Sequence, residues 1–271
     1  MRFEWNKNNV MSLGIILLVL WIILAILFGI YDLEISIFLA NNESIPGNIG
    51  KYYGEAPGYG LIGISIAILI GSISINPNKQ KLGAVFPIFI GTIYLIIGIS
   101  GSNVKAVIDG SGTLISILIF LVLFFKKDWR DYRNLAWIIF LIFILNVLLF
   151  VQSFKFFWGR VRFYNLNMDY SNYTPWYLPR GPTGNLSFPS GHASVSFMLI
   201  PLLIPIVKSE SKKIVKLVFS TLIIGWALFI AISRVLIGAH YASDILFSSA
   251  FACFLTLLLY ILIYEREKFN M

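Results

Sequence analysis

The sequence contains few charged residues, one cysteine and two histidines, and each shortage excludes a class of protein. Charged residues make up 13% of the 271 residues, against roughly 25% in soluble domains, so a water-soluble globule of this size is excluded. The single cysteine, Cys253, excludes an intrachain disulfide. The only histidines are His192 and His240. The sequence therefore shows no evident set of metal ligands. We therefore expect neither a resident metal nor a cofactor.

Hydrophobic residues make up 58% of the chain and form long runs. A membrane-spanning helix needs roughly 20 predominantly apolar residues, and eight candidate runs lie near residues 11–30, 59–75, 83–101, 112–126, 134–154, 193–207, 215–232 and 245–263. We interpret the first run as a retained span, because it is longer than a signal-peptide core and no small-residue cleavage site follows. Backbone in lipid must satisfy its own hydrogen bonds. The sequence therefore predicts an all-α polytopic bundle of about eight spans, a single domain over residues 1–271.

The net charge of +8 arises from basic residues whose distribution indicates the orientation of the chain in the membrane. It does not indicate a nucleic-acid partner. With the N-terminus inside, 14 of the 21 basic residues fall in inner segments: Arg2, Lys7, Lys79, Lys81, Lys126, Lys127, Arg130, Arg133, Lys208, Lys212, Lys213, Lys216, Arg266 and Lys268. The other seven fall outside: Lys51, Lys105, Lys155, Arg160, Arg162, Arg180 and Arg234. The positive-inside rule then places both termini in the cytoplasm of a cell-membrane protein.

Two outer segments are longer than the other connections. The first, Tyr31–Gly58, mixes acidic and apolar residues and is predicted to hold an interfacial amphipathic helix. The second, Phe163–Phe188, is rich in Tyr, Asn, Pro and Gly, a composition and length typical of lids and binding loops. We expect its Trp176 and Tyr177 to act as anchors at the membrane interface.

Three polar clusters fall on the predicted outer side. Lys155 and Arg162, at the end of the fifth span, are seven residues apart and share one side if the helix continues; alternatively, they snorkel to the interface. The second cluster is Pro189-Ser-Gly-His192, where Pro and Ser can open a helix and Gly lets backbone approach a ligand. A helix start of this kind can bind an anion, although a simple helix cap explains it equally well.

The third cluster is Ser233-Arg234-x5-His240-x3-Asp244. His240 and Asp244 are four residues apart, so the carboxylate can reach one imidazole nitrogen and leave the other free for attack. The alternative is an ordinary His–Asp pair at a helix end. Arg234 lies near the membrane edge, where an unpaired charge is costly, and it therefore needs Asp244 or an anionic ligand.

Together the three clusters suit phosphate chemistry. Three cations and a helix start can stabilise a transferring phosphoryl group. Two histidines suit a covalent displacement, in which one attacks phosphorus and the other protonates the leaving oxygen and then activates water.

In this order, the clusters resemble the signature of the type 2 phosphatidic acid phosphatase superfamily, which reads Lys-x6-Arg-Pro, Pro-Ser-Gly-His and Ser-Arg-x5-His-x3-Asp. The second and third motifs match at every specified position. The first matches at Lys155 and Arg162, but Phe163 stands where the family has proline, which puts the local geometry after Arg162 in doubt. The motif-bearing segment covers residues 155–244, and the chain before it matches only as hydrophobic spans.

The resemblance implies a metal-independent phosphatase built on a six-span helical core. In it His240 is the nucleophile, Asp244 orients it, and His192 is the acid and then the base. The groups implied to hold the phosphoryl oxygens are Lys155, Arg162, Ser190, Gly191 and Arg234. Arg160 is outside the motifs and is expected to be a charge on the rim. The two spans beyond six are predicted to form an extra hairpin around the third and fourth spans.

Within such a family the predicted substrate is a lipid phosphate or pyrophosphate attacked at the outer face, with a polyprenyl pyrophosphate as the first choice, because an outward-facing site suits recycling of a carrier discharged there. A phosphatidic acid or phosphatidylglycerophosphate phosphatase is the alternative. From other classes, the chain can be a transporter or a non-catalytic lipid-binding protein. Charges grouped at span ends on one face disfavour the transporter, and the intact His192, His240 and Asp244 disfavour the non-catalytic protein.

Overall fold

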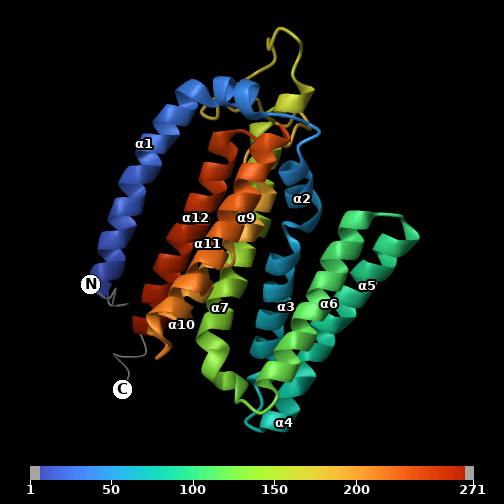
Figure 1. Cartoon of the computed structure of the whole chain (residues 1–271), viewed down its shortest axis with the longest axis vertical. Coiled ribbons are helices and arrows are strands. Elements are labelled where there is room, and N and C mark those ends of the chain that lie inside the picture. The colour runs from blue at the N-terminus through green and yellow to red at the C-terminus, as the bar shows by residue number, and fades with distance from the viewer. Residues whose placement is uncertain (1–6, 266–271) are drawn as a thin grey trace.

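The computed structural model describes residues 7–265 and is a bundle of helices, with no strand in that range (Figure 1). Eight helical segments are long and apolar enough to cross a membrane, which confirms the predicted polytopic all-α fold. They are Lys7–Leu39, Ile45–Gly71, Pro77–Ser100, Val104–Phe124, Trp129–Asn165, Gly191–Lys208, Lys213–Leu236 and Ala242–Tyr264. The N- and C-terminal ends lie at one end of the bundle, and the long 166–190 connection lies at the other (Figure 1).

Helix α1 (Lys7–Leu39) is longer than the predicted first span. Its 33 residues reach about 50 Å, against a hydrocarbon core of about 30 Å, and its last turns lie across the upper end of the bundle (Figure 1). The segment expected to hold an interfacial helix is therefore shared by three helices: the end of α1, α2 (Ile45–Tyr53) and the start of α3 (Ala56–Gly71). Ser44 caps α2 by accepting a hydrogen bond from the N–H of Gly47 at 3.2 Å.

A hairpin of two long helices packs on one side of the bundle (Figure 1). After the short turns α4 (Pro77–Gln80) and η1 (Lys81–Ala84), it consists of α5 (Val85–Ser100) and α6 (Val104–Phe124). Helix α5 packs chiefly on α6, and α6 packs on α3. The helices approach closely at Gly98, where an added Cβ would lie 2.6 Å from the backbone nitrogen of Val107. The third and fourth spans thus form a hairpin, as predicted; that it is an addition to a six-span core stays a prediction.

The fifth span is continuous but changes its winding. A one-turn helix η2 (Trp129–Tyr132) leads into α7 (Arg133–Ile142), the π-helical stretch η3 (Phe143–Val151) and α8 (Gln152–Trp158). It ends at Gly159, which has a φ of 55°, a left-handed conformation that favours glycine at a helix end. An added Cβ there would also lie 2.0 Å from the carbonyl oxygen of Gly181, so both the turn and the close packing require glycine.

The last three spans carry the second and third motifs at their upper ends. The sixth is broken into α9 (Gly191–Phe197), η5 (Ile200–Leu202) and α10 (Leu203–Lys208). It is followed by α11 (Lys213–Leu236) and by α12 (Ala242–Tyr260), which continues as η6 (Ile261–Glu265). Helix α9 packs against α11, α12 and η3. The three motif-bearing segments are thereby brought to one place in the bundle.

Candidate active site

The three sequence motifs meet at the end of the bundle opposite the termini. The backbone N–H of Ser190 donates to the carbonyl oxygen of Asp244 at 3.1 Å, which joins the start of α9 to the start of α12. Lys155, on α8, reaches the same place: an added Cβ on Gly191 would lie 3.5 Å from Lys155 Nζ. The ammonium group of Lys155 therefore lies next to the start of α9.

Ser190 caps helix α9 as the sequence predicts. It is fully buried, and its hydroxyl oxygen accepts a hydrogen bond from the N–H of Ala193 at 3.4 Å. The cap fixes the first turn of α9 and with it the position of His192, the second residue of the helix.

His240 and Asp244 form the predicted pair. His240 Nδ1 lies 3.4 Å from Asp244 Oδ2, and the ring is almost fully buried at 2% exposure. The backbone N–H of His240 donates to the carbonyl oxygen of Arg234 at 3.2 Å. Burial lowers the pKa of His240 from 6.5 to about 4; Asp244 opposes this, and the positive charges of Lys155 and Arg234 add to it. The imidazole is therefore neutral near pH 7, the form that can attack an electrophile.

Asp244 is held from several directions at once. Its Oδ2 accepts hydrogen bonds from Ser187 Oγ at 2.5 Å and from the backbone N–H of Tyr241 at 2.9 Å. Its Oδ1 accepts from Arg160 Nη1 at 2.6 Å. Although it has no exposed surface, this carboxylate has partners on both oxygens that fix its orientation, so it can fix the ring of His240.

Arg160 is not the rim charge that the sequence predicted. It is 1% exposed and bridges two buried carboxylates, with Nη2 2.9 Å from Asp32 Oδ2 as well as Nη1 near Asp244. Its Nε donates to the carbonyl oxygen of Thr174 at 2.8 Å, and its guanidinium lies 3.9 Å from the centre of the Tyr241 ring. The prediction for Arg160 was wrong because its partner Asp32 lies 128 residues away in the sequence.

Asp32 is a second buried charged residue at this site that the motifs do not contain. It lies on α1, is fully buried, and accepts a hydrogen bond from the backbone N–H of Ser243 at 2.9 Å through Oδ1. The sequence feature that could have revealed Asp32 is a carboxylate within an apolar helix, because such a charge requires a buried partner. Through Asp32 the first span is bonded directly to the start of α12.

His192 faces a different set of partners. Its Nδ1 lies 3.4 Å from Glu55 Oε1, and its Nε2 lies 3.3 Å from the carbonyl oxygen of Lys51. The ring is also close enough to interact electrostatically with His240 and with Arg234. The two predicted catalytic histidines thus lie at the same end of the bundle, each with a carboxylate beside Nδ1.

The predicted phosphate-binding cations Lys155, Arg162 and Arg234 lie close enough to interact electrostatically with one another. Arg162 interacts electrostatically with both Lys155 and Arg234, and its Nη1 donates to the hydroxyl of Tyr164 at 2.5 Å. Arg234 is 6% exposed. Its Nε and Nη1 are buried and make no hydrogen bond with any residue that the structure describes. A buried guanidinium with unpaired donors can bind an anion.

Phe163, in the position of the expected proline, packs on the turn that carries His240. An added Cβ on Gly238 would lie 3.1 Å from Phe163 Cδ1, and the backbone N–H of Tyr164 donates to the carbonyl oxygen of Gly238 at 3.2 Å. The Phe163 ring also meets Tyr241 edge-on, with centroids 6.5 Å apart. The chain after Arg162 is therefore fixed to the His240 turn by packing.

The loop over this end is docked on the bundle through Trp176. Its Nε1 donates to the carbonyl oxygen of Ala25 on α1 at 2.9 Å, and its ring packs on Phe247 with centroids 4.5 Å apart. The prediction that Trp176 anchors at the membrane interface is wrong, because its polar atom is bonded inside the protein. Tyr177 is 55% exposed and remains a predicted anchor.

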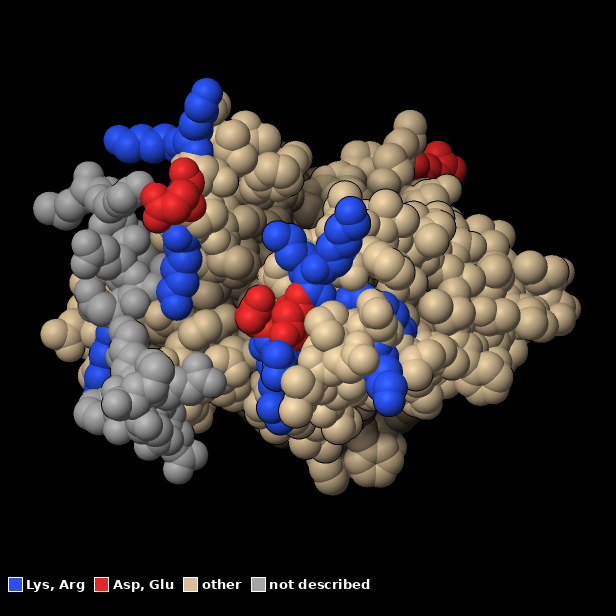
Figure 2. All heavy atoms as spheres, turned by 90° about the horizontal axis from the view of Figure 1, so that it is seen from below, with Lys and Arg blue, Asp and Glu red and all other residues tan. Residues whose placement is uncertain are grey.

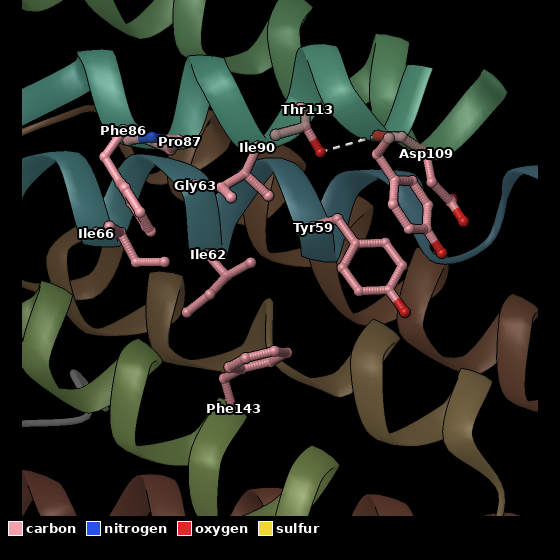
Figure 3. A pocket seen from close by; sticks show the side chains of 12 residues that line it. Tyr59, Ile62, Gly63, Ile66, Phe86, Pro87, Ile90, Asp109, Thr113 and Phe143 are labelled. Atoms are coloured by element: carbon pink, nitrogen blue, oxygen red, sulfur yellow. Dashed lines mark hydrogen bonds between the residues drawn. The ribbon is translucent and has the colours of Figure 1, made fainter. Parts of the chain in front are cut away.

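An apolar pocket of about 390 Å³ lies between the hairpin, α3 and η3 (Figure 3). Residues such as Ile62, Ile66 and Phe143 line most of it. Tyr59 and Asp109 lie at one end, where Thr113 Oγ1 donates to the Asp109 carbonyl oxygen at 2.8 Å (Figure 3). The pocket is large enough for part of a hydrocarbon chain.

Comparison with known proteins gives one positive finding. A family model described as the PAP2 superfamily matches residues 135–268, which include all three motifs. No match was found among curated proteins or among solved structures.

Proposed function

Because residues 135–268 match the family model of the PAP2 superfamily, we propose that the chain belongs to this family of membrane phosphatases and hydrolyses a lipid phosphate or pyrophosphate through a phosphohistidine. The observation that carries this proposal is the pair of unbonded, buried guanidinium nitrogens of Arg234, close to His192 and His240. A phosphoryl group supplies the missing anion. Lys155, Arg162, Ser190 and Gly191 complete the proposed phosphate site.

The first step is attack by His240. Its Nδ1 faces Asp244, so Nε2 carries the lone pair that forms the bond to phosphorus. The bond from phosphorus to the leaving oxygen breaks, and His192 gives that oxygen a proton. Positive charge that develops on the His240 ring is balanced by Asp244, whose position Arg160 and Ser187 maintain.

The second step regenerates the enzyme. His192, now without its proton, takes one from a water molecule as the water oxygen attacks phosphorus. The bond between phosphorus and His240 breaks, inorganic phosphate leaves, and His192 again carries a proton. Every proton in the cycle moves through side chains of this protein, and the proposed reaction needs no metal.

The membrane setting supports an amphiphilic substrate. The proposed site lies at the end of a membrane bundle, and the apolar pocket beside the hairpin can accept part of a lipid tail. Among lipids we favour a polyprenyl pyrophosphate, since three cations gathered around the proposed phosphate site suit a highly charged headgroup. A phosphatidic acid or phosphatidylglycerophosphate headgroup is the alternative.

The charge distribution supports a site that faces outward. Figure 2 views the end that carries the termini and shows basic side chains on it with fewer acidic ones. The exposed cations in and next to the connections at this end are Lys79, Lys126, Lys127, Arg130, Arg133, Lys208, Lys212 and Lys213; Arg2, Arg266 and Lys268 lie outside the described residues. By the positive-inside rule this end is cytoplasmic in the cell membrane, and the proposed active site faces the outer side.

The function is tested with purified protein in detergent that contains a chelator and no divalent metal. Polyprenyl pyrophosphate, phosphatidic acid and phosphatidylglycerophosphate are supplied in parallel, and phosphate release is measured for the wild type and for His240→Ala. Release by the wild type alone, with an acid-labile phosphorylated enzyme trapped on rapid quenching, supports the proposal. Equal release by both proteins contradicts the role of His240, and release by neither contradicts the proposal and favours a transport or binding role.

A further inference from the structure

The ring of His192 is held between two acceptors from the chain around α2 and α3. Glu55 Oε1 lies 3.4 Å from Nδ1, and the Lys51 carbonyl oxygen lies 3.3 Å from Nε2. A carboxylate and a carbonyl only accept hydrogen bonds. These partners therefore match an imidazole that has a proton on each nitrogen, which is the form that a general acid requires.

Glu55 is itself fixed by the hairpin. It is 7% exposed and lies between α2 and α3, and its second oxygen, Oε2, forms an ion pair with Lys105 at the start of α6. Lys105 Nζ also lies 2.7 Å from Asp109 Oδ2, one turn further along α6. The two oxygens of Glu55 are thus divided between the hairpin and His192, and the hairpin limits how the carboxylate can turn.

His192 and His240 are held in the same kind of arrangement, which is built from different residues in each case. On one side, His240 faces Asp244, and Asp244 is held by Arg160. On the other, His192 faces Glu55, and Glu55 is held by Lys105. A carboxylate on one ring nitrogen fixes the orientation of an imidazole and stabilises its protonated form. Glu55 also interacts electrostatically with Arg234 and Lys155, so it lies beside the proposed phosphate site as well as beside His192.

We propose that Glu55 is the positioning residue of His192 and that Lys105 acts through it, so that the hairpin is part of the catalytic apparatus. The inference rests on the proposed function. When substrate binds, its leaving oxygen takes the place of the Lys51 carbonyl at Nε2 of His192. The proton on Nε2 passes to that oxygen as its bond to phosphorus breaks, while Nδ1–H remains directed at Glu55. Neither Glu55 nor Lys105 lies in the segment that the family model matches.

The test uses Glu55→Gln, which keeps the shape and removes the charge, and Lys105→Gln. Glu43→Gln is the matched control, because Glu43 is exposed at the same end of the molecule. Two substrates separate a catalytic from a structural effect. A lipid phosphate has an alkoxide leaving group that needs a proton, whereas p-nitrophenyl phosphate releases a phenolate that leaves without one.

On the lipid phosphate, Glu55→Gln should lower kcat about 10- to 100-fold with little change in KM, as is typical when a partner of a working histidine is lost. On p-nitrophenyl phosphate it should give a rapid burst of one nitrophenolate per site at the wild-type rate, followed by slow turnover. The reason is that His192 is not needed to release the phenolate but is still needed to activate water. Lys105→Gln should act in the same direction, and the double variant should be no worse than Glu55→Gln alone.

Unchanged kcat on the lipid phosphate in Glu55→Gln would overturn the inference. So would a burst that is slowed as much as lipid turnover, since a merely structural defect affects both. If Glu55→Gln fails to fold, Lys105→Gln carries the same test with the same outcomes, because Lys105 is partly exposed and less central to packing. A wild type that releases no phosphate from any substrate is a distinct result, and it rejects the proposed function itself.

Discussion

The two histidines of the candidate site have the same kind of partner but acquire it in different ways. Asp244 lies four residues after His240, so a single helix turn brings carboxylate and ring together. Glu55 reaches His192 only because α3, α6 and α9 pack in one place. The first pair is local and visible as a motif. The second depends on the tertiary structure, and the difference predicts that the two pairs respond differently to mutation.

The largest effect is expected from removing the charge of the local pair. Asp244→Asn should lower kcat on the order of 10⁴-fold, the magnitude found when the carboxylate of a catalytic triad is replaced by an amide, because the amide no longer holds His240 in the attacking tautomer. Steady-state kinetics with a lipid phosphate would measure it, and KM should change little. A loss no greater than that of Glu55→Gln would remove the distinction between the pairs.

Arg160, which binds Asp244, and Lys105, which binds Glu55, should differ in their effect on stability. Arg160→Met leaves Asp32 and Asp244 buried without a counter-charge, and breaking such a buried pair costs about 3–5 kcal/mol. Lys105 is partly exposed, so Lys105→Gln should destabilise the protein far less. Thermal unfolding in detergent measures both, with Arg180→Met as an exposed-arginine control. Equal losses for Arg160→Met and Arg180→Met would contradict the bridging role of Arg160.

Protonation of His240 should make folding depend on pH. Burial lowers the pKa of His240 from 6.5 to about 4, so between these values the unfolded chain binds a proton that the folded one does not. Stability should therefore fall as the pH is lowered from about 7 toward 4. Tm measured across this range should decline more steeply in the wild type than in His240→Gln, which lacks this imidazole. Parallel curves would show that His240 is not buried as described.

The smallest effect is expected at the position that departs from the family pattern. Arg162 has φ −71° and ψ 149°, a conformation that is compatible with a following proline. Phe163→Pro should therefore preserve the backbone and lose only the packing on the His240 turn, with a change in kcat within about threefold and a Tm lower by a few degrees. Loss of activity comparable to that of Glu55→Gln would mean that the phenylalanine ring positions His240.

Features that depend on local patterns could be predicted from the sequence. Ion pairs between residues far apart in the sequence could not. The eight spans and the three motifs could be predicted because each depends on a run or a spacing within one segment. The first span was predicted to end at Ile30 and the fourth to begin near residue 112. Helix α1 instead continues past Asp32, and α6 begins at Val104, before Lys105 and Asp109.

The same cause explains the errors within the site. A span predicted from hydropathy ends at a charged residue, because an unpaired charge is costly in lipid. In the folded protein Asp32 bonds to Arg160, and Lys105 bonds to Glu55 and Asp109, so the helices extend through these residues. The partners are 50 residues apart for Lys105 and Glu55 and 128 for Arg160 and Asp32. No local window contains both members of either pair.

The bridge from Asp32 through Arg160 to Asp244 joins the first span to the last. During synthesis the first helix therefore enters the bilayer with a carboxylate whose counter-charge is translated much later, and the bridge closes only when the final helix has been inserted. A chain that ends before Asp244 cannot close the bridge, so under the proposed function it cannot orient His240.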